Sequence, residues 1–196
     1  MNAWIKPILL RGPHVVLEPM SKEHVKGLKL AVADGELWNL WYTHVPNISE
    51  VGRYVETALA EQESGQSIPF VICDAETKRV IGSTRFCHID HQNKRVEIGY
   101  TWYAKSFQRT RMNTQCKYLL LEHAFETLEC IAVEFRTHWH NQASRNAILR
   151  LGAKQDGVLR NHQVMADGGY RDTVVFSIIN QEWPVIKTSL TNKLLR

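Results

Sequence analysis

Residues 95–114 read RVEIGYTWYAKSFQRTRMNT and are typical of a strand that leads directly into a helix. From 95 to 103, apolar side chains alternate with polar ones, as expected when one face of a strand is buried. Gly99 in mid-strand indicates a bulge or the close approach of another backbone. A helix is expected from about Asn113 to Leu128, where apolar residues recur at helical spacing. The strand residues expected to share one face are Val96, Ile98, Tyr100 and Trp102, with Arg95, Glu97 and Thr101 on the other.

The junction between this strand and this helix has the features of an anion site. The first amides of a helix lack partners within the helix, and the helix dipole places partial positive charge at the same end. Both properties suit a pyrophosphate. Lys105, Arg109 and Arg111 add charge around the junction. The alternative is an ordinary basic loop between a strand and a helix.

On either side of this unit the chain alternates short strands and helices. Further helices are expected from Ser21 to Asp34–Gly35, from Ser49 towards Gly65, and from Asn141 to Leu151, the last ended by Gly152 in a left-handed conformation. Further strands are expected at 14–19, 68–73, 79–89, 131–138, about 157–165 and 173–180, with a last helical turn or two after Trp183-Pro184. This order predicts a mixed α/β fold.

The composition limits the classes of protein. A chain of 196 residues with 44% hydrophobic residues suits one domain over 1–196, with its core at about 10–185. We expect a cytoplasmic protein without a membrane span, because no segment is long and apolar enough and the first ten residues do not read as a secretory signal. The net charge of +4 is not concentrated in a run, which argues against direct nucleic-acid binding. The cysteines lack CxxC spacing and are expected to be buried free thiols: Cys73, Cys87, Cys116 and Cys130.

Three motifs resemble the GNAT N-acetyltransferase superfamily. Gln108 to Asn113 stands where these enzymes carry Q/R-x-x-G-x-G/A, and Glu97 to Tyr100 resembles their E-I-G-Y strand. Asn141 to Ala153 is similar to their N-x-x-S…L-G-F/A helix. With Arg11-Gly12-Pro13 and Gly157 to Arg160, the pattern resembles the RimJ/RimL-like branch, which includes ribosomal-protein N-terminal acetyltransferases. The resemblance implies the GNAT fold, an α+β arrangement with a mostly antiparallel central sheet of about seven strands flanked by helices.

The resemblance also implies acetyl-CoA as co-substrate, with its pyrophosphate on the junction and its pantetheine arm along the strand near Gly99. Arg111 and Asn113 replace the two loop glycines of the family, so the backbone approaches a phosphate less easily, although an arginine can meet phosphate directly. The residues implied in binding the cofactor are Gly99, Tyr100, Thr101, Gln108, Arg109, Thr110, Arg111, Met112, Asn113, Thr114, Asn141 and Ser144.

Two residues are candidates for catalysis. Glu97 is the candidate general base, because direct transfer needs a neutral amine; the alternative is an exposed glutamate paired with Arg95 or Lys94. Ile148 occupies the position of the tyrosine that often protonates the thiolate in this family. Ser144 is therefore expected to hydrogen-bond the sulfur or the pantetheine arm, although it can equally satisfy its own helix.

The acceptor is expected to enter beside residues 36–50. Trp38, Trp41 and Tyr42 can shape that slot or serve as core anchors, and His138 can line the cleft. A metal is not expected, because His138 and His140 have no acidic or thiol cluster at matching spacing. The leading hypothesis is acetyl transfer to a protein N-terminal α-amine by direct attack, in a monomer or homodimer. A small-molecule amine acceptor and a catalytically silent acyl-CoA sensor are the alternatives.

Overall fold

A single eight-stranded sheet organises the chain in the computed structural model, which describes residues 4–165 and 167–195. Its order is β1-β2-β3-β4-β5-β6-β8-β7, and every neighbouring pair is antiparallel except β5 and β6. The sequence predicted about seven strands, and the strand that it did not predict is the two-residue β1. The strands are β1 (Leu10–Arg11), β2 (Val15–Pro19), β3 (Ser67–Asp74), β4 (Val80–Asp90), β5 (Arg95–Tyr103), β6 (Ala132–His138), β7 (Lys154–Val164) and β8 (Tyr170–Ile179).

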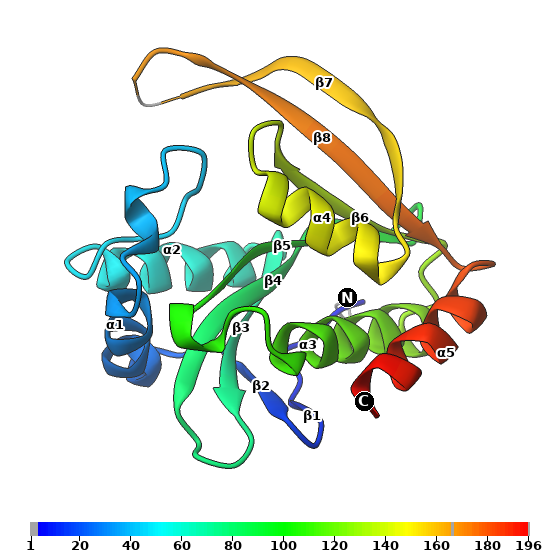
Figure 1. Ribbon diagram of the computed structural model, residues 1–196, viewed down its shortest axis with the longest axis horizontal. Helices are drawn as coiled ribbons and strands as arrows, with labels where there is room; N and C mark the ends of the chain where they lie inside the picture. The colour runs from blue at the N-terminus through cyan, green and yellow to red at the C-terminus, as the bar shows by residue number, and fades with distance from the viewer. Residues whose placement is uncertain (1–3, 166, 196) are drawn as a thin grey trace.

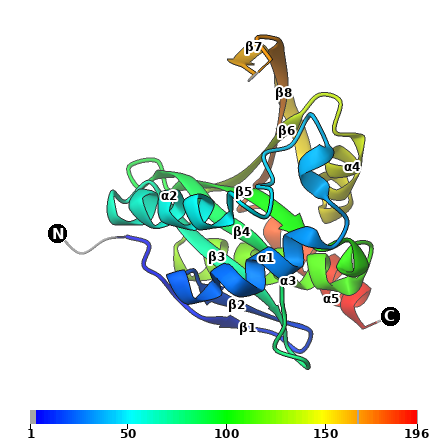
Figure 2. The same cartoon turned by 90° about the vertical axis from the view of Figure 1, so that its left-hand side faces the viewer.

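Helices cover both faces of the sheet (Figures 1 and 2). The larger buried cluster contains apolar residues of α3, α4 and α5, and the smaller one contains those of α1 and α2. We refer to these as the α3 side and the α2 side of the sheet. No helix in the described ranges is long and apolar enough to cross a membrane. The helices are α1 (Val25–Ala33), α2 (Val51–Glu63), α3 (Arg111–Glu122), α4 (Gln142–Leu151) and α5 (Trp183–Leu194), with short 3-10 turns η1 (Lys22–His24), η2 (Leu37–Asn39) and η3 (Lys105–Phe107) and a π-helical turn η4 (His123–Thr127).

Several helix ends follow their sequence signals, and others do not. Ser21 forms the predicted N-terminal capping arrangement, and Gly152 ends α4 with a φ of 103°. α3 begins at Arg111, two residues before the predicted start, because the Thr110 side chain caps it by accepting from the Met112 amide at 3.3 Å. Two further predictions were wrong: α2 begins at Val51 without a side-chain cap from Ser49, and α5 is twelve residues long rather than a turn or two.

A bulge interrupts β5 and changes which residues share a face. Ser83 pairs with Trp102 and Arg85 with Gly99, so two residues of β5 lie opposite one of β4. Tyr100 occupies the bulge with a φ of 52°. This confirms the bulge predicted from Gly99. After the bulge, the predicted alternation of faces is wrong. Trp102 packs on the α2 side, whereas Ile98 packs on the α3 side.

Strands β5 and β6 separate soon after they meet. Their parallel ladder contains three pairs, Arg95–Ala132, Val96–Val133 and Glu97–Glu134. Because the bulge bends β5 immediately afterwards, the edge of β5 from Gly99 onwards has no β6 ladder. We call this opening the fork; Figure 1 shows α3 beside it and α4 following β6.

Candidate active site

Glu97 lies at the last ladder pair, at the apex of the fork. Only 6% of the residue is exposed. Its Oε2 is 2.8 Å from Nδ1 of His88, to which it is hydrogen-bonded. The same oxygen is 3.3 Å from Nε of Arg136. This distance allows an ion pair, although the Nε–H is not aligned for a hydrogen bond. The alternative of an exposed glutamate paired with Arg95 or Lys94 is wrong: both of these cations pair with other carboxylates.

The charges around Glu97 form a short network across β5 and β6. Glu134, opposite Glu97 in the ladder, accepts hydrogen bonds from Arg95 and Arg136. Burial alone would raise the pKa of Glu134, but these two hydrogen bonds lower it. The hydrogen bond to Glu97 raises the pKa of His88. The network therefore holds both carboxylates in fixed positions, with Arg136 between them.

One group of side chains near the apex can in principle hold a metal ion. Cys87, His88 and Glu97 place one ligand atom each within 4.8 Å of one another. Sequence spacing missed this group, because its members come from two strands. Burial raises the pKa of the Cys87 thiol well above its usual range, and the Arg136 guanidinium is already paired with Glu97. Both features oppose a thiolate and a cation at this position.

The predicted pyrophosphate site lies at the start of α3. Thr110 uses one of the free amides, that of Met112, and also donates to Phe107 O at 2.7 Å. Gln108 donates to Tyr103 O at 3.1 Å, so its side chain supports the turn. The exposed Arg109 has a φ of 58°, and Arg111 is the first helical residue and is also exposed. Asn113 and Thr114 are half-buried in the first turn, and Met112 packs against the core of the α3 side.

The start of α4 flanks the fork from β6. Asn141 caps this helix, since its side-chain oxygen accepts from the Ser144 amide at 3.0 Å. Among the described residues, the half-buried Ser144 hydroxyl makes no hydrogen bond. Ile148 is buried one turn further along. Ser144 thus has a free hydroxyl, whereas the Asn141 side chain already has a structural role.

Aromatic residues gather where residues 40–44 approach the end of β6. The Trp41 ring lies 5.0 Å from His138, 5.5 Å from Tyr42 and 5.6 Å from His140, measured between ring centroids. Trp41 is 59% exposed and is therefore no core anchor. Trp38 does not join this group, because it packs on the core of the α2 side. The structure thus brings together three of the four predicted acceptor-site residues.

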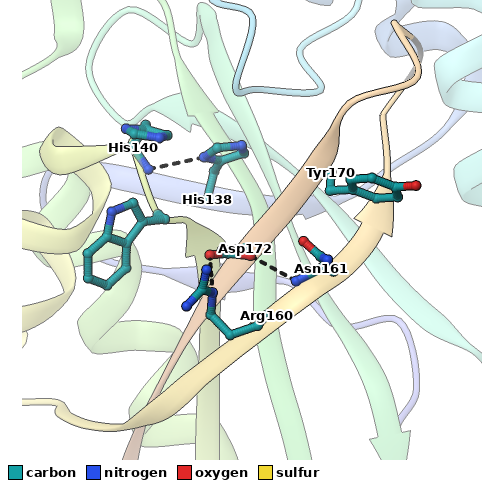
Figure 3. Close-up of a pocket in the computed structure, with 7 residues that line it drawn as sticks. His138, His140, Arg160, Asn161, Tyr170 and Asp172 are labelled. Atoms are coloured by element: carbon teal, nitrogen blue, oxygen red, sulfur yellow. Dashed lines mark hydrogen bonds and ion pairs between the residues drawn. The ribbon is translucent and has the colours of Figure 1, made fainter.

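A hollow of about 190 Å³ adjoins this aromatic group (Figure 3). Asp172 on β8 accepts from Nε of Arg160 at 2.5 Å and from the Asn161 amide at 2.8 Å, which ties β7 to β8 at the wall of the hollow. Burial, followed by the nearby Arg171, lowers the pKa of His138, so that its ring is neutral at pH 7. The lining residues are His138, Trp139, His140, Arg160, Asn161, Tyr170 and Asp172.

Sequence reasoning missed these hairpin residues and, among the buried cations, one that makes no ion pair in the described residues. The hairpin residues carry no motif, and only the pairing of β6 with β8 brings them to His138. The cation is Lys117 on α3, which is only 6% exposed. A signal for it was present, since Lys117 stands at helical spacing from the apolar Leu120, Leu121 and Ala124.

The structure combines a mostly antiparallel sheet that forks beside a helix start with a buried carboxylate at the apex of the fork. A family model described as acetyltransferase (GNAT) domain matches residues 14–154, more than half of the chain. The chain therefore belongs to the GNAT acetyltransferase family.

Individual relatives agree with this assignment. The chain is 29% identical to the uncharacterized N-acetyltransferase p20 of Bacillus licheniformis over 61% of its own length and 66% of that protein. A GCN5-related N-acetyltransferase from Brucella melitensis is 27% identical, with a TM-score of 0.86, over 97% of this chain and 86% of that one.

Two more distant structures share the fold. One is a Salmonella typhimurium acetyltransferase that modifies the N-terminal serine of ribosomal protein L7/L12, at 20% identity and a TM-score of 0.77, over 88% of this chain and 99% of that one. The other is the Microcin C7 self-immunity acetyltransferase MccE in complex with acetyl-CoA and AMP, at 20% identity and a TM-score of 0.74, over 86% of this chain and 93% of that one.

Proposed function

We propose that this protein transfers the acetyl group of acetyl-CoA to a primary amine by direct attack. The observation that carries the proposal is the fork: an unpaired strand edge at Gly99–Thr101 runs from the start of α3 to a buried carboxylate at Glu97. Such an edge can pair with the amides of a pantetheine arm, as a neighbouring strand would. The helix start and the exposed Arg109 and Arg111 fit the pyrophosphate.

The residues of the chain then have separate tasks. Bound acetyl-CoA supplies an activated acyl group as a thioester. Glu97 accepts the proton of the incoming ammonium, directly or through water, because only the neutral amine is nucleophilic. A backbone amide of 97–101 stabilises the charge that develops on the carbonyl oxygen. Arg136 and His88 hold the Glu97 carboxylate in place.

Binding of acetyl-CoA is the first experiment. Saturating cofactor at about 100 times its Kd stabilises a folded protein by roughly 2.7 kcal/mol. We therefore expect the Tm to rise by several degrees with acetyl-CoA. Release of free thiol in the presence of peptide and small-amine pools then separates an enzyme from a sensor. A protein whose Tm does not respond to acetyl-CoA would contradict both.

Arg111 tests how the site works without loop glycines. We expect Arg111→Ala to weaken acetyl-CoA binding about tenfold in Kd, because a charge-assisted hydrogen bond to phosphate contributes about 1.5–3 kcal/mol. The turnover number at saturating cofactor should change little. Isothermal titration calorimetry measures the effect, with Arg53→Ala on α2 as a control for the loss of an arginine. An unaltered Kd would show that Arg111 is an exposed charge that does not contribute to acetyl-CoA binding.

The acceptor we propose is a protein N-terminal α-amine. The Salmonella typhimurium structure with the same fold is described as acetylating such an amine, and the open aromatic group around Trp41 offers a surface for an extended peptide. A small-molecule amine is the second candidate, favoured by the confined hollow beside His138. Mass spectrometry of peptide and small-amine pools incubated with acetyl-CoA distinguishes the two. We also propose that the protein acts in the cytoplasm without a metal, as a monomer or homodimer.

A further inference from the structure

A buried lysine on α3 lies beside the fork, and its positive charge has no evident structural role there. Lys117 extends from α3 so that its Nζ lies 2.6 Å from the Thr101 hydroxyl on β5 and 5.9 Å from the ring centroid of Phe135 on β6. Its ammonium group therefore lies between the two strands, below the point where they separate. In the part of the chain that the structure describes, it makes no ion pair.

Packing does not explain a lysine here. A buried ammonium without a carboxylate partner is costly, and the neighbouring helix positions at the same face carry Leu120 and Leu121. Burial lowers the pKa of Lys117 to about 8, although Cys116, Cys87 and Glu97 oppose this shift. A lysine with such a pKa exchanges a proton close to neutral pH, as a general acid must.

We propose that the ammonium group of Lys117 gives its proton to the thiolate that departs during acetyl transfer. The inference depends on the proposed function, because it places the thioester beside Thr101. In that position the sulfur lies within reach of a donor already bonded to the Thr101 hydroxyl. The residue at the position of the family tyrosine is the buried Ile148, which has no proton to give.

The proton balance of the step is complete. The acceptor ammonium loses a proton to Glu97, and the neutral amine forms a bond to the acyl carbon. The carbon–sulfur bond breaks, its electron pair stays on sulfur, and the sulfur takes a proton from Lys117. The new amide nitrogen loses its surplus proton to solvent, Lys117 regains one from solvent, and Glu97 releases to solvent the proton that it accepted. One amide, one thiol and one released proton are the products.

The test compares Lys117→Met with the wild type and with Lys29→Met, an exposed lysine on α1 as control. We expect Lys117→Met to lower kcat about 10²-fold with little change in KM for acetyl-CoA. The wild-type kcat should fall as pH rises past about 8, and this limb should be missing in the variant. The thiols of Cys116 and Cys87, which also face Lys117, have pKa values raised by burial. Because both of these pKa values are raised, the two thiols do not produce the limb.

Two measurements separate this role from a structural one. Because the folded state lowers the pKa of Lys117, its charge destabilises the fold in full below pH 8, and this effect fades as pH rises towards 10.5. The Tm of Lys117→Met should therefore rise at pH 7 while activity falls. Free CoA should bind the wild type partly as thiolate, detected by ultraviolet absorbance, and should lose this absorbance in the variant.

The possible failures are distinguishable. A variant with wild-type kcat and an unchanged alkaline limb would overturn the role of Lys117 and leave the proposed function intact. Loss of activity through a higher KM alone, with the thiolate signal unchanged, would overturn it as well. If CoA does not bind the wild type at all, the proposed function and the role of Lys117 fall together.

Discussion

Glu97→Gln is expected to lower kcat about 10³-fold while the Kd for acetyl-CoA stays at its wild-type value. An α-ammonium group with a pKa near 8 is mostly protonated at neutral pH, and an alkylammonium with a pKa near 10 almost fully, so the reaction needs a base at the point of attack. Glutamine has the same shape and can still accept from His88, but it takes up no proton. Steady-state kinetics with saturating acceptor, together with calorimetry of cofactor binding, measure the two constants.

Glu134→Gln is the matched control for this experiment. Glu134 faces Glu97 across the ladder, is also partly buried, and shares Arg136 with it. It lies on β6 and has both of its arginine partners beside it, so we expect its replacement to change kcat by less than tenfold. If the two variants lose activity equally, the network rather than the base at Glu97 is what the reaction requires.

Gly82→Ala is expected to lower the free energy of unfolding by about 3–5 kcal/mol, which is at the upper end for a single substitution. A Cβ at Gly82 would lie 2.1 Å from the carbonyl oxygen of Trp102, and this neighbour is backbone. The contact cannot be relieved by a rotamer change, so β4 must move away from β5. The displaced segment follows the bulge directly. Urea denaturation measures the loss, and activity should fall with it.

Gly52→Ala provides the opposite result in the same assay. Gly52 lies in α2, and a Cβ there meets nothing within 4 Å. Because alanine favours a helix over glycine, we expect a gain of about 1 kcal/mol. A loss of less than 1 kcal/mol for Gly82→Ala would contradict the rigidity that we assign to the β4–β5 pair.

The fold was largely predictable because local signals and the final packing agree. The strand at 95–103 has the predicted bounds, and the glycine after Leu151 ends its helix in the expected conformation. The errors arise where one residue changes the geometry of its neighbours. Tyr100 in a left-handed conformation moves Trp102 to the other face, and a periodic pattern does not reveal this. Thr110 lengthens α3 through a cap that sequence reasoning placed inside the loop.

The site was predictable only in part, because distant segments build it. Glu97 could be selected from its strand, but its burial and its contact with Arg136 depend on β6. Trp41 and Trp38 stand three residues apart and look equivalent in sequence, yet only Trp41 reaches His138. Lys117 interrupts the apolar stripe of α3, and this exception could have been recognised in the sequence.

The hollow beside His138 and the apex of the fork differ in how they are anchored. Arg160, Asn161 and Asp172 belong to the β7–β8 hairpin at one margin of the sheet, where, among the described residues, β7 pairs with β8 alone. Glu97 and Lys117 are held by the centre of the molecule. Under the proposed function, mutations at the rim can thus accumulate and redirect selectivity among amines over evolutionary time, while the acyl-transfer chemistry is inherited unchanged.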